Sequence, residues 1–276
     1  MLIFIHENER NLINFRITIE RMNSKKVVII GGGNVAYHLI SSITSSGHKL
    51  VQIYNRTPSK ILNASGSANL VNQVHGITHE ADIYIVCVKD TAIAEVVGSL
   101  RLKDKLVVHT SGNRSMNLLS EVSSKFGVFY PIQSFTKEIP IQFKKTPIII
   151  EANTDAALKE LELFAKSISN VVESMDELSR QKLNVAGVFA NNFTNHLFTL
   201  VNDYLKNENI DFKILLPLIQ NTVDKLSLGS PHEMQTGPAV RSDMATIQNH
   251  LEILNANPEM KEIYQYMTHK ILNYYA

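Results

Sequence analysis

Ten consecutive residues read Val27-Val28-Ile29-Ile30-Gly31-Gly32-Gly33-Asn34-Val35-Ala36. An apolar run followed by Gly31-x-Gly33-x-x-Ala36 is typical of a buried strand that turns tightly into a helix. Gly31 permits the turn, Gly33 lets a pyrophosphate approach the main chain, and Ala36 lets the helix pack closely on the sheet. Because the first N–H groups of a helix attract anions, we expect a dinucleotide to bind at this turn. The residues expected to bind it are Gly31, Gly33, Asn34 and Val35. The alternative is a glycine-rich turn that binds no ligand.

Short apolar runs alternate with helical patterns along the chain that follows. The pattern predicts strands over 26–31, 49–54, 83–88, 106–109, 128–130, 148–151 and 171–173, with helices over 34–46, 91–100 and 116–125 between them. Such alternation favours a mostly parallel sheet with helices on both faces. After about Met175 the pattern predicts only helices, over 176–206, 211–227, 239–255 and 258–274. We therefore expect an α/β fold with a dinucleotide-binding domain over 22–175 and an all-α domain over 176–276.

Residues 1–21 look unlike the sequence that follows them. Met22-Asn23-Ser24-Lys25-Lys26 leads straight into the first apolar strand, as the start of a domain would. We expect residues 1–21 to be an N-terminal extension outside the fold. The alternative is that they form an additional strand or helix.

The composition excludes several classes of protein. The 276 residues include 27 Lys and Arg against 26 Asp and Glu, a net charge of +1, so charge alone would not hold nucleic acid or an anionic membrane. No apolar run approaches the ~20 residues that cross a bilayer. Cys87 is the only cysteine, which excludes an internal disulfide and a zinc site built on several cysteines. The histidines include no HExxH pattern, so we assign no metal. This composition fits a protein of the reducing cytoplasm.

The end of the second predicted strand bears on the choice of dinucleotide. It reads Tyr54-Asn55-Arg56-Thr57-Pro58, without the acidic residue that usually binds the ribose hydroxyls of NAD. Neutral Asn55 would not repel a 2′-phosphate, and the Arg56 guanidinium can pair with one. The sequence thus favours NADP over NAD. The alternative is that Asn55 and Thr57 only cap the next helix.

Two further strands end in polar residues. Ligands of open α/β sheets bind at the carboxyl ends of the strands, so we expect Val88 and Lys89 to lie beside the cofactor's nicotinamide. At the next strand end, Ser111 is expected to bind substrate and His109 to transfer a proton. The alternatives are that His109 is a packing residue bonded to the backbone and that Asp90 is only a helix cap.

The predicted helical domain contains a third polar group. Asp243, Thr246 and His250 fall at i, i+3 and i+7 and so share one helix face. We expect Arg241 to hold an anionic substrate group and Asp243 or His250 to transfer a proton. The alternative is an exposed helix face that only bonds to a neighbouring domain.

Taken together, these motifs resemble one family, the Rossmann-like NADP oxidoreductases with a helical C-terminal domain. They are related to pyrroline-5-carboxylate reductase, deazaflavin-dependent NADP reductase and the β-hydroxyacid dehydrogenases. The stretches that carry the resemblance are 31–36, 54–56, 109–112, 129–135, 189–193, 236–243 and His250. The resemblance implies a homodimer built through the helical domain and an active cleft lined by 236–250.

The sequence also departs from this family. Members often carry His at the positions of Tyr130 and Asn184, so a proton donor placed there by analogy is not carried over. The Lys-x-x-x-Asn pair of β-hydroxyacid dehydrogenases is not reproduced, because Lys182 is followed four residues later by Ala186. The first hypothesis is therefore an enzyme, an NADPH-dependent reductase that passes a hydride to a small carbonyl or imine. The second is a sensor or scaffold dimer that binds NADP without turnover.

Overall fold

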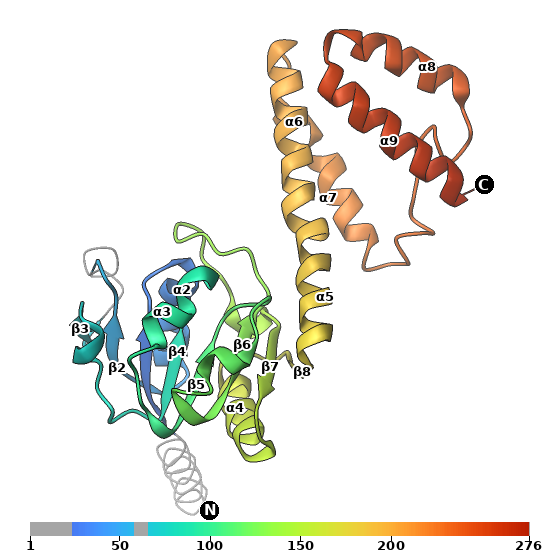
Figure 1. The fold of residues 1–276 in the computed structure, drawn as a ribbon. Helices are drawn as coiled ribbons and strands as arrows, with labels where there is room; N and C mark the ends of the chain where they lie inside the picture. Colours follow the sequence, from blue (N-terminus) through green and yellow to red (C-terminus); the bar gives the residue numbers. More distant parts are fainter. Residues whose placement is uncertain (1–23, 58–65, 276) are drawn as a thin grey trace, which may run out of the picture. The chain divides into compact units, whose positions relative to one another are not determined.

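A computed structural model describes residues 24–57 and 66–275, so the expectations for residues 1–21 lie outside the described part. The described residues form an eight-stranded sheet in the order β3-β2-β1-β4-β5-β6-β7-β8, followed by a helical region (Figure 1). This confirms the predicted α/β class. By its contacts the chain divides into two compact units, which meet in sequence between Val188 and Phe189.

The first unit contains the whole sheet. Its strands are β1 (Lys26–Ile30), β2 (Lys49–Tyr54), β3 (Asn69–Val71), β4 (Ile83–Val86), β5 (Lys103–His109), β6 (Ser123–Pro131), β7 (Ile148–Ala152) and β8 (Val172–Ser174). All neighbouring strands pair in parallel except β6 and β7, which are antiparallel. The carboxyl ends of β1, β4, β5 and β6 therefore meet at one edge of the sheet.

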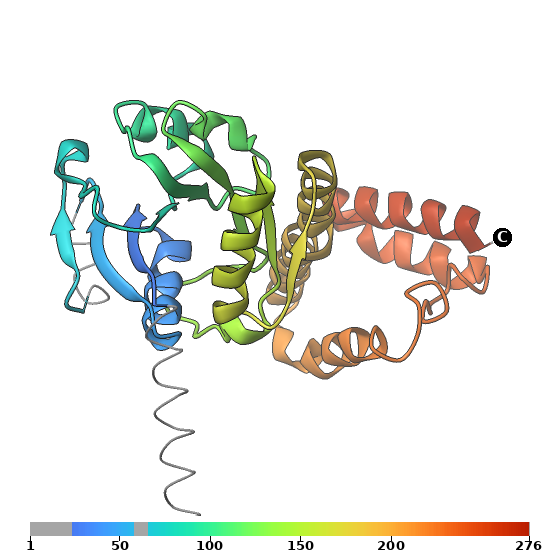
Figure 2. The same ribbon diagram turned by 90° about the horizontal axis from the view of Figure 1, so that it is seen from below.

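Helices cover both faces of this sheet. They are α2 (Asn34–Ser45), α3 (Ile93–Val97) and α4 (Asp155–Ile168). Helix α5 (Glu177–Gly187) follows β8 along the chain. Leu39 of α2 and Leu161 of α4 pack with Ile29 in one buried cluster, so these two helices share a face (Figure 2). Ile93 of α3 packs with Val28 on the opposite face. Alternate residues of β1 thus point into separate cores, as the pleat of a strand requires.

Two differences from the sequence-based expectations concern the sheet. The short strand β3 was not expected. The helix predicted over 116–125 is wrong, because only a 3-10 turn, Met116–Leu119, forms there before β6 begins at Ser123. Ser123 pairs with Lys103 of β5, and its hydroxyl donates to the carbonyls of Lys103 and Lys105. Strand pairing therefore overrides the local helical pattern.

The second unit contains helices α6 (Thr194–Asn207), α7 (Leu216–Lys225), α8 (Met244–Ile253) and α9 (Pro258–Tyr275). Helix α5 runs into α6 through a π-helical segment, Val188–Phe193, so the long helix predicted over 176–206 is confirmed. Helix α8 begins later than the predicted residue 239. The preceding residues form a turn in which Gly237 has φ +119° and Ser242 φ +53°. None of the helices in the described residues is long and apolar enough to cross a bilayer.

Candidate functional site

The glycine turn after β1 is held by a close backbone approach. Gly31 has φ +123°, and a Cβ built on it would lie 2.3 Å from the carbonyl oxygen of Cys87. The Gly31 N–H donates to the carbonyl of Tyr54 at 2.7 Å. Gly31 therefore sits between the ends of β2 and β4, where only glycine fits.

Gly33 lies in a different environment. No atom of the described residues comes within 4 Å of a Cβ built on Gly33, and its φ of −77° is open to any residue. Gly33 is the N-cap of α2, and within the described chain no side chain caps this end of the helix. The first N–H groups of α2 are thus free of a side-chain acceptor, and the space beside Gly33 is open, which fits a bound phosphate.

The middle glycine, Gly32, makes room for Asn55. A Cβ built on Gly32 would lie 2.6 Å from Asn55 Nδ2. That amide donates to the carbonyl of Thr57 at 2.7 Å, which closes the turn after β2 and leaves Arg56 exposed. Sequence reasoning missed this role of Gly32, since the pattern of the motif leaves the position unspecified.

The loop after β6 is tied to the start of α2. Asn34 Nδ2 donates to the carbonyl of Phe135 at 2.7 Å, and His38 Nε2 lies 2.9 Å from the carbonyl of Thr136. The side chain of Asn34 is therefore engaged within the protein. Asn34 would therefore contact a cofactor through its main chain. Cofactor binding by Asn34 stays a prediction.

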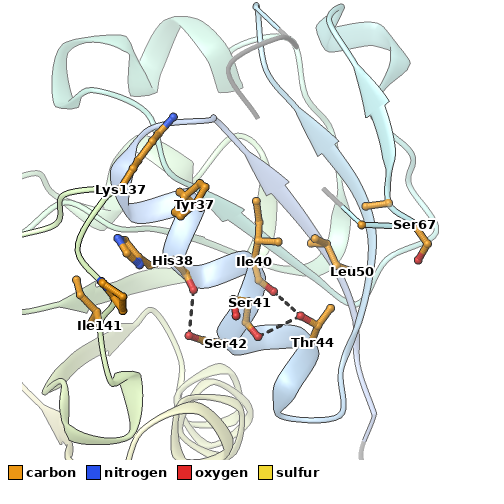
Figure 3. Close-up of a pocket in the computed structure, with 13 residues that line it drawn as sticks. Tyr37, His38, Ile40, Ser41, Ser42, Thr44, Leu50, Ser67, Lys137 and Ile141 are labelled. Carbon is orange, nitrogen blue, oxygen red and sulfur yellow. Dashed lines mark hydrogen bonds between the residues drawn. The ribbon is translucent and has the colours of Figure 1, made fainter. Parts of the chain in front are cut away.

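The outer side of α2 also lines a hollow of about 530 Å³, which Figure 3 shows. Lys137 points over the ring of Tyr37, with its Nζ 5.7 Å from the ring centroid. The hydroxyls of Ser42 and Thr44 already donate to helix carbonyls. These hydroxyls are thus satisfied within the helix, and we assign no ligand to this hollow.

The predicted substrate residue Ser111 is almost fully engaged by its own loop. Its hydroxyl donates to Asp90 Oδ2 at 2.7 Å and accepts from the N–H groups of Asn113 and Arg114 at 3.2 and 3.1 Å. These contacts join the ends of β4 and β5. Lys89 is exposed beside Asp90, and Val88 is half-buried. Substrate binding by Ser111 and cofactor binding by Val88 and Lys89 stay predictions.

His109 is completely buried at the end of β5. Its Nδ1 accepts from the N–H of Ser111 at 3.2 Å, so Nε2 carries the hydrogen and donates to the carbonyl of Ser115 at 3.2 Å. Burial lowers the pKa of His109 to about 4, so the ring is neutral near pH 7. These contacts favour a structural role, and proton transfer by His109 stays a prediction.

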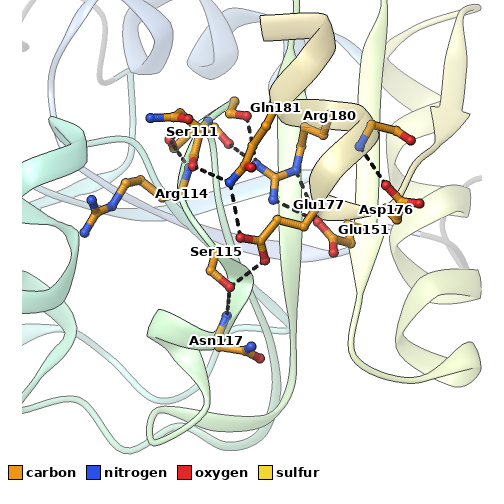
Figure 4. Close-up of polar contacts among 12 residues, drawn as sticks. Ser111, Arg114, Ser115, Asn117, Glu151, Asp176, Glu177, Arg180 and Gln181 are labelled. Atoms are coloured by element: carbon orange, nitrogen blue, oxygen red, sulfur yellow. Dashed lines mark hydrogen bonds and ion pairs between the residues drawn. The ribbon is translucent and has the colours of Figure 1, made fainter. Parts of the chain in front are cut away.

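Helix α5 holds this loop through a buried ion pair (Figure 4). Arg180 is fully buried, and its Nε and Nη2 donate to Glu151 Oε2 at 3.1 and 2.9 Å. Its Nη1 donates to the carbonyls of Gly112 and Ser111 at 2.9 and 3.3 Å. A buried charge with a partner and two carbonyls satisfies its donors and fixes the geometry around it.

Two more residues of α5 bond to the same loop. Gln181 Nε2 donates to the carbonyl of Asn113 at 3.1 Å, and Ser115 Oγ donates to Glu177 Oε2 at 2.7 Å. Sequence reasoning missed this cluster, although Glu177, Arg180 and Gln181 fall at i, i+3 and i+4, the spacing of one helix face. Side chains of α5 therefore bond to four of the five residues of the 111–115 loop.

A tyrosine lies over the same loop. Asn184 Nδ2 donates to the hydroxyl oxygen of Tyr130 at 3.0 Å. A Cβ built on Gly112 would lie 2.6 Å from Tyr130 Cζ and 2.7 Å from Asn184 Nδ2. Gly112 therefore leaves just enough room for this polar pair at the carboxyl edge of the sheet.

The remaining predicted residues belong to the second unit. Asp243 caps α8, and hydrogen bonds from the Thr246 hydroxyl and N–H hold its pKa below the usual range. Asp243 is therefore a carboxylate at neutral pH. His250 Nδ1 lies 2.9 Å from the hydroxyl of Tyr264, and Arg241 is exposed. The structure joins Asp243 to Thr246 by hydrogen bonds and places Arg241 and His250 near enough to lower the pKa of Asp243 further through their charges. The catalytic roles of Arg241, Asp243 and His250 stay predictions.

One solved structure is similar along nearly its whole length. It is described as a "putative NADP oxidoreductase" from Bacteroides fragilis, is 35% identical, has a TM-score of 0.84, and the match covers 91% of this chain and 99% of that chain. The chain belongs to this NADP oxidoreductase family. Residues 26–113 of the oxidoreductase match the family model "NADP oxidoreductase coenzyme F420-dependent", and residues 146–271 match a domain of unknown function, DUF2520.

More distant structures share the fold of this oxidoreductase. A 1-pyrroline-5-carboxylate reductase from Streptococcus pyogenes is 12% identical with a TM-score of 0.60, over 91% of this chain and 99% of that chain. A reductive aminase from Aspergillus terreus, solved with an NADPH derivative, cyclohexanone and allyl amine, is 15% identical with a TM-score of 0.66, over 90% and 92% of the two chains. A search of curated proteins gave no match.

Proposed function

We propose that this oxidoreductase uses NADPH to reduce a small carbonyl or imine substrate. The observation that carries the proposal is the open turn at Gly33, where uncapped helix N–H groups fit a pyrophosphate. When bound, the cofactor supplies the hydride. Family membership supports the cofactor class, and the fold shared with reductases of C=N bonds supports the substrate class.

The preference for NADPH over NADH rests on the end of β2. Asn55 turns its amide toward the carbonyl of Thr57 and presents no carboxylate to a 2′-phosphate. The exposed guanidinium of Arg56 follows it directly. Charge-assisted pairing of a guanidinium with a phosphate is worth about 1.5–3 kcal/mol.

The variant Arg56→Asp tests this preference by titration calorimetry. Its dissociation constant for NADPH should rise about 10- to 150-fold, which corresponds to the loss of such a pair, while NADH affinity stays unchanged. Arg101→Asp is the control, because Arg101 is also exposed but bonds to the carbonyls of Gly98 and Leu100. Equal losses for NADPH and NADH would contradict the 2′-phosphate assignment.

Turnover separates the two hypotheses drawn from the sequence. The wild-type protein is mixed with NADPH and a panel of cyclic imines, ketones and 2-keto acids, and the loss of NADPH absorbance is followed. Oxidation of NADPH with one of these acceptors supports the reductase. Tight binding of NADPH without oxidation would instead support the sensor or scaffold.

We propose further that the partner of this chain is a second copy, bound through residues 189–275. Large apolar side chains are exposed across this unit, among them Phe189 at 64%, Ile214 at 69% and Leu228 at 79%. A groove of about 280 Å³ between α6, α9 and residues 236–239 has a mostly apolar lining. Monomeric proteins rarely expose this much apolar surface. Light scattering should give a mass near twice 31.0 kDa; a monomer at micromolar concentration would contradict the dimer.

A further inference from the structure

We propose that Tyr130 donates the proton that the substrate needs, and that Asn184 and Gly112 position its hydroxyl. This inference rests on the proposed reduction. A carbonyl or neutral imine requires a proton on its oxygen or nitrogen as well as a hydride on its carbon, so the site must contain a proton donor.

The first support is where the sheet places Tyr130. Strand β6 runs parallel to β5 with Val128 opposite His109, the last residue of β5, so Tyr130, the penultimate residue of β6, lies at the carboxyl edge of the sheet. Ligands of open α/β sheets bind at this carboxyl edge. The side chain of Tyr130 is half-buried, so part of it faces solvent.

The second support is the direction of the hydrogen bond. Asn184 Nδ2 donates to the Tyr130 oxygen at 3.0 Å. A phenol that accepts through its oxygen still has its own hydrogen to donate. Within residues 24–57 and 66–275 the structure shows no other hydrogen bond to this hydroxyl, so the hydrogen is available to a ligand.

The third support is that neighbouring groups are already engaged. His109 is neutral with both ring nitrogens bonded to main-chain groups. The Ser111 hydroxyl donates its hydrogen to Asp90. Neither has a hydrogen to give a ligand without breaking a contact that holds the loop, whereas Tyr130 does.

The surroundings hold the hydroxyl in place. Arg180 binds the carbonyl of Gly112, and Asn184 follows one helical turn later on the same face of α5. The ring of Tyr130 lies against Gly112, where a Cβ would be only 2.6 Å from Cζ. Asn184 and Gly112 are therefore positioning residues for the phenol.

The carbon of the C=O or C=N bond takes a hydride from NADPH, and the π electrons move to the oxygen or nitrogen. That atom takes the proton of Tyr130 as the phenolic O–H bond breaks. The phenolate then takes a proton from water, which restores the enzyme.

The main test is Tyr130→Phe, which keeps the ring over Gly112 and removes the hydroxyl. For an acceptor that the wild-type enzyme reduces, kcat should fall about 100-fold or more, the range of general-acid catalysis, while NADPH affinity stays unchanged. Tyr84→Phe is the matched control, because the Tyr84 hydroxyl donates to the carbonyl of Thr78; its kcat should be unchanged. Equal kcat for wild type and Tyr130→Phe would overturn this inference and leave the proposed reductase intact.

A binding test does not depend on turnover. A small lactam, whose carbonyl accepts a hydrogen bond but is not reduced, is titrated into protein saturated with NADP⁺. The wild type should bind it about 3- to 10-fold more tightly than Tyr130→Phe, the effect of one hydrogen bond. Equal affinity, or no binding by the wild type, would overturn the assignment of Tyr130. If the wild type reduces no acceptor, the proposed reduction fails, and this comparison still decides whether Tyr130 donates.

Asn184→Leu tests the positioning role. The variant should lower kcat about 10-fold with little change in KM, because the hydroxyl remains but is no longer held. In Tyr130→Phe the same change should have no further effect, since residues that act as a unit are not additive. Equal effects in both backgrounds would show that Asn184 does not act through Tyr130.

Discussion

Adding one methyl group at Gly33 should separate cofactor binding from folding. A Cβ at this position meets no atom of the described residues within 4 Å. With φ −77° and ψ −172°, the backbone is in a region that alanine adopts freely. Replacing Gly by Ala at a helix N-cap lowers the stability of the folded state by up to about 1 kcal/mol. Alanine also reduces the conformational entropy of the unfolded chain, which raises stability by about 0.4–1 kcal/mol and offsets this loss. The free energy of unfolding of Gly33→Ala should therefore differ from wild type by less than about 1 kcal/mol.

Cofactor binding should respond differently. The new methyl group would occupy the space in which a pyrophosphate must approach the main chain. Loss of one charge-assisted hydrogen bond costs about 1.5–3 kcal/mol, so the dissociation constant for NADPH should rise about 10- to 150-fold. Titration calorimetry measures the affinity, and urea unfolding measures the stability.

Two other glycines provide the comparison. Gly187→Ala is the matched control, because a Cβ there also has no described neighbour within 4 Å; NADPH affinity should be unchanged. Gly31→Ala should instead unfold the protein, since its Cβ would lie 2.3 Å from the carbonyl of Cys87. If Gly33→Ala bound NADPH as tightly as wild type, the phosphates would not lie at this turn and the reasoning would be refuted.

Other expected outcomes concern stability and reactivity. The variant Arg180→Met leaves the Glu151 carboxylate without its partner and should lower the free energy of unfolding, measured in urea, by about 3–5 kcal/mol. A loss below about 1 kcal/mol would contradict the stabilising role of this ion pair. Burial raises the pKa of the Cys87 thiol to about 12, so a thiol reagent at neutral pH should label the protein only after unfolding, and rapid labelling of the native state would refute this. Burial lowers the pKa of His109 from 6.5 to about 4, so the unfolded chain binds the extra proton first as the pH falls. The contribution of His109 to the free energy of unfolding should therefore be full above about pH 6.5 and decrease by about 3 kcal/mol toward pH 4. The variant His109→Gln should lose this pH-dependent contribution. An unchanged pH profile of stability in His109→Gln would contradict the role of His109.

The local sequence pattern predicted correctly those strands and helices whose apolar residues recur with a clear period. The strand predicted over 49–54 matches β2, which a short apolar run marks, and the helix predicted from Asn34 begins there, directly after the glycine turn. The pattern failed at Ser123, where pairing with β5 outweighs local propensity. It also missed the three residues of β3, a length too short for periodicity to show.

Contacts between distant residues could not be inferred in this way. Arg180 and Glu151 each look like ordinary surface residues in the sequence, and only the fold buries them together. The same holds for Tyr130 and Asn184, whose bond joins a strand to a helix 54 residues away. By contrast, His109 was correctly singled out as lying at a strand end, while the hydrogen bonds that engage its ring depend on how the following loop closes.

The π-helical segment Val188–Phe193 bears on how related chains can differ in length. A turn of this kind holds one residue more than an α-helical turn, so deleting a single residue there would restore regular winding without breaking the helix. Because the π-helical turn absorbs this extra residue locally, the deletion would leave the following helix in nearly the same rotational register. Relatives of this chain can therefore gain or lose one residue at this point while the helix that follows keeps its direction.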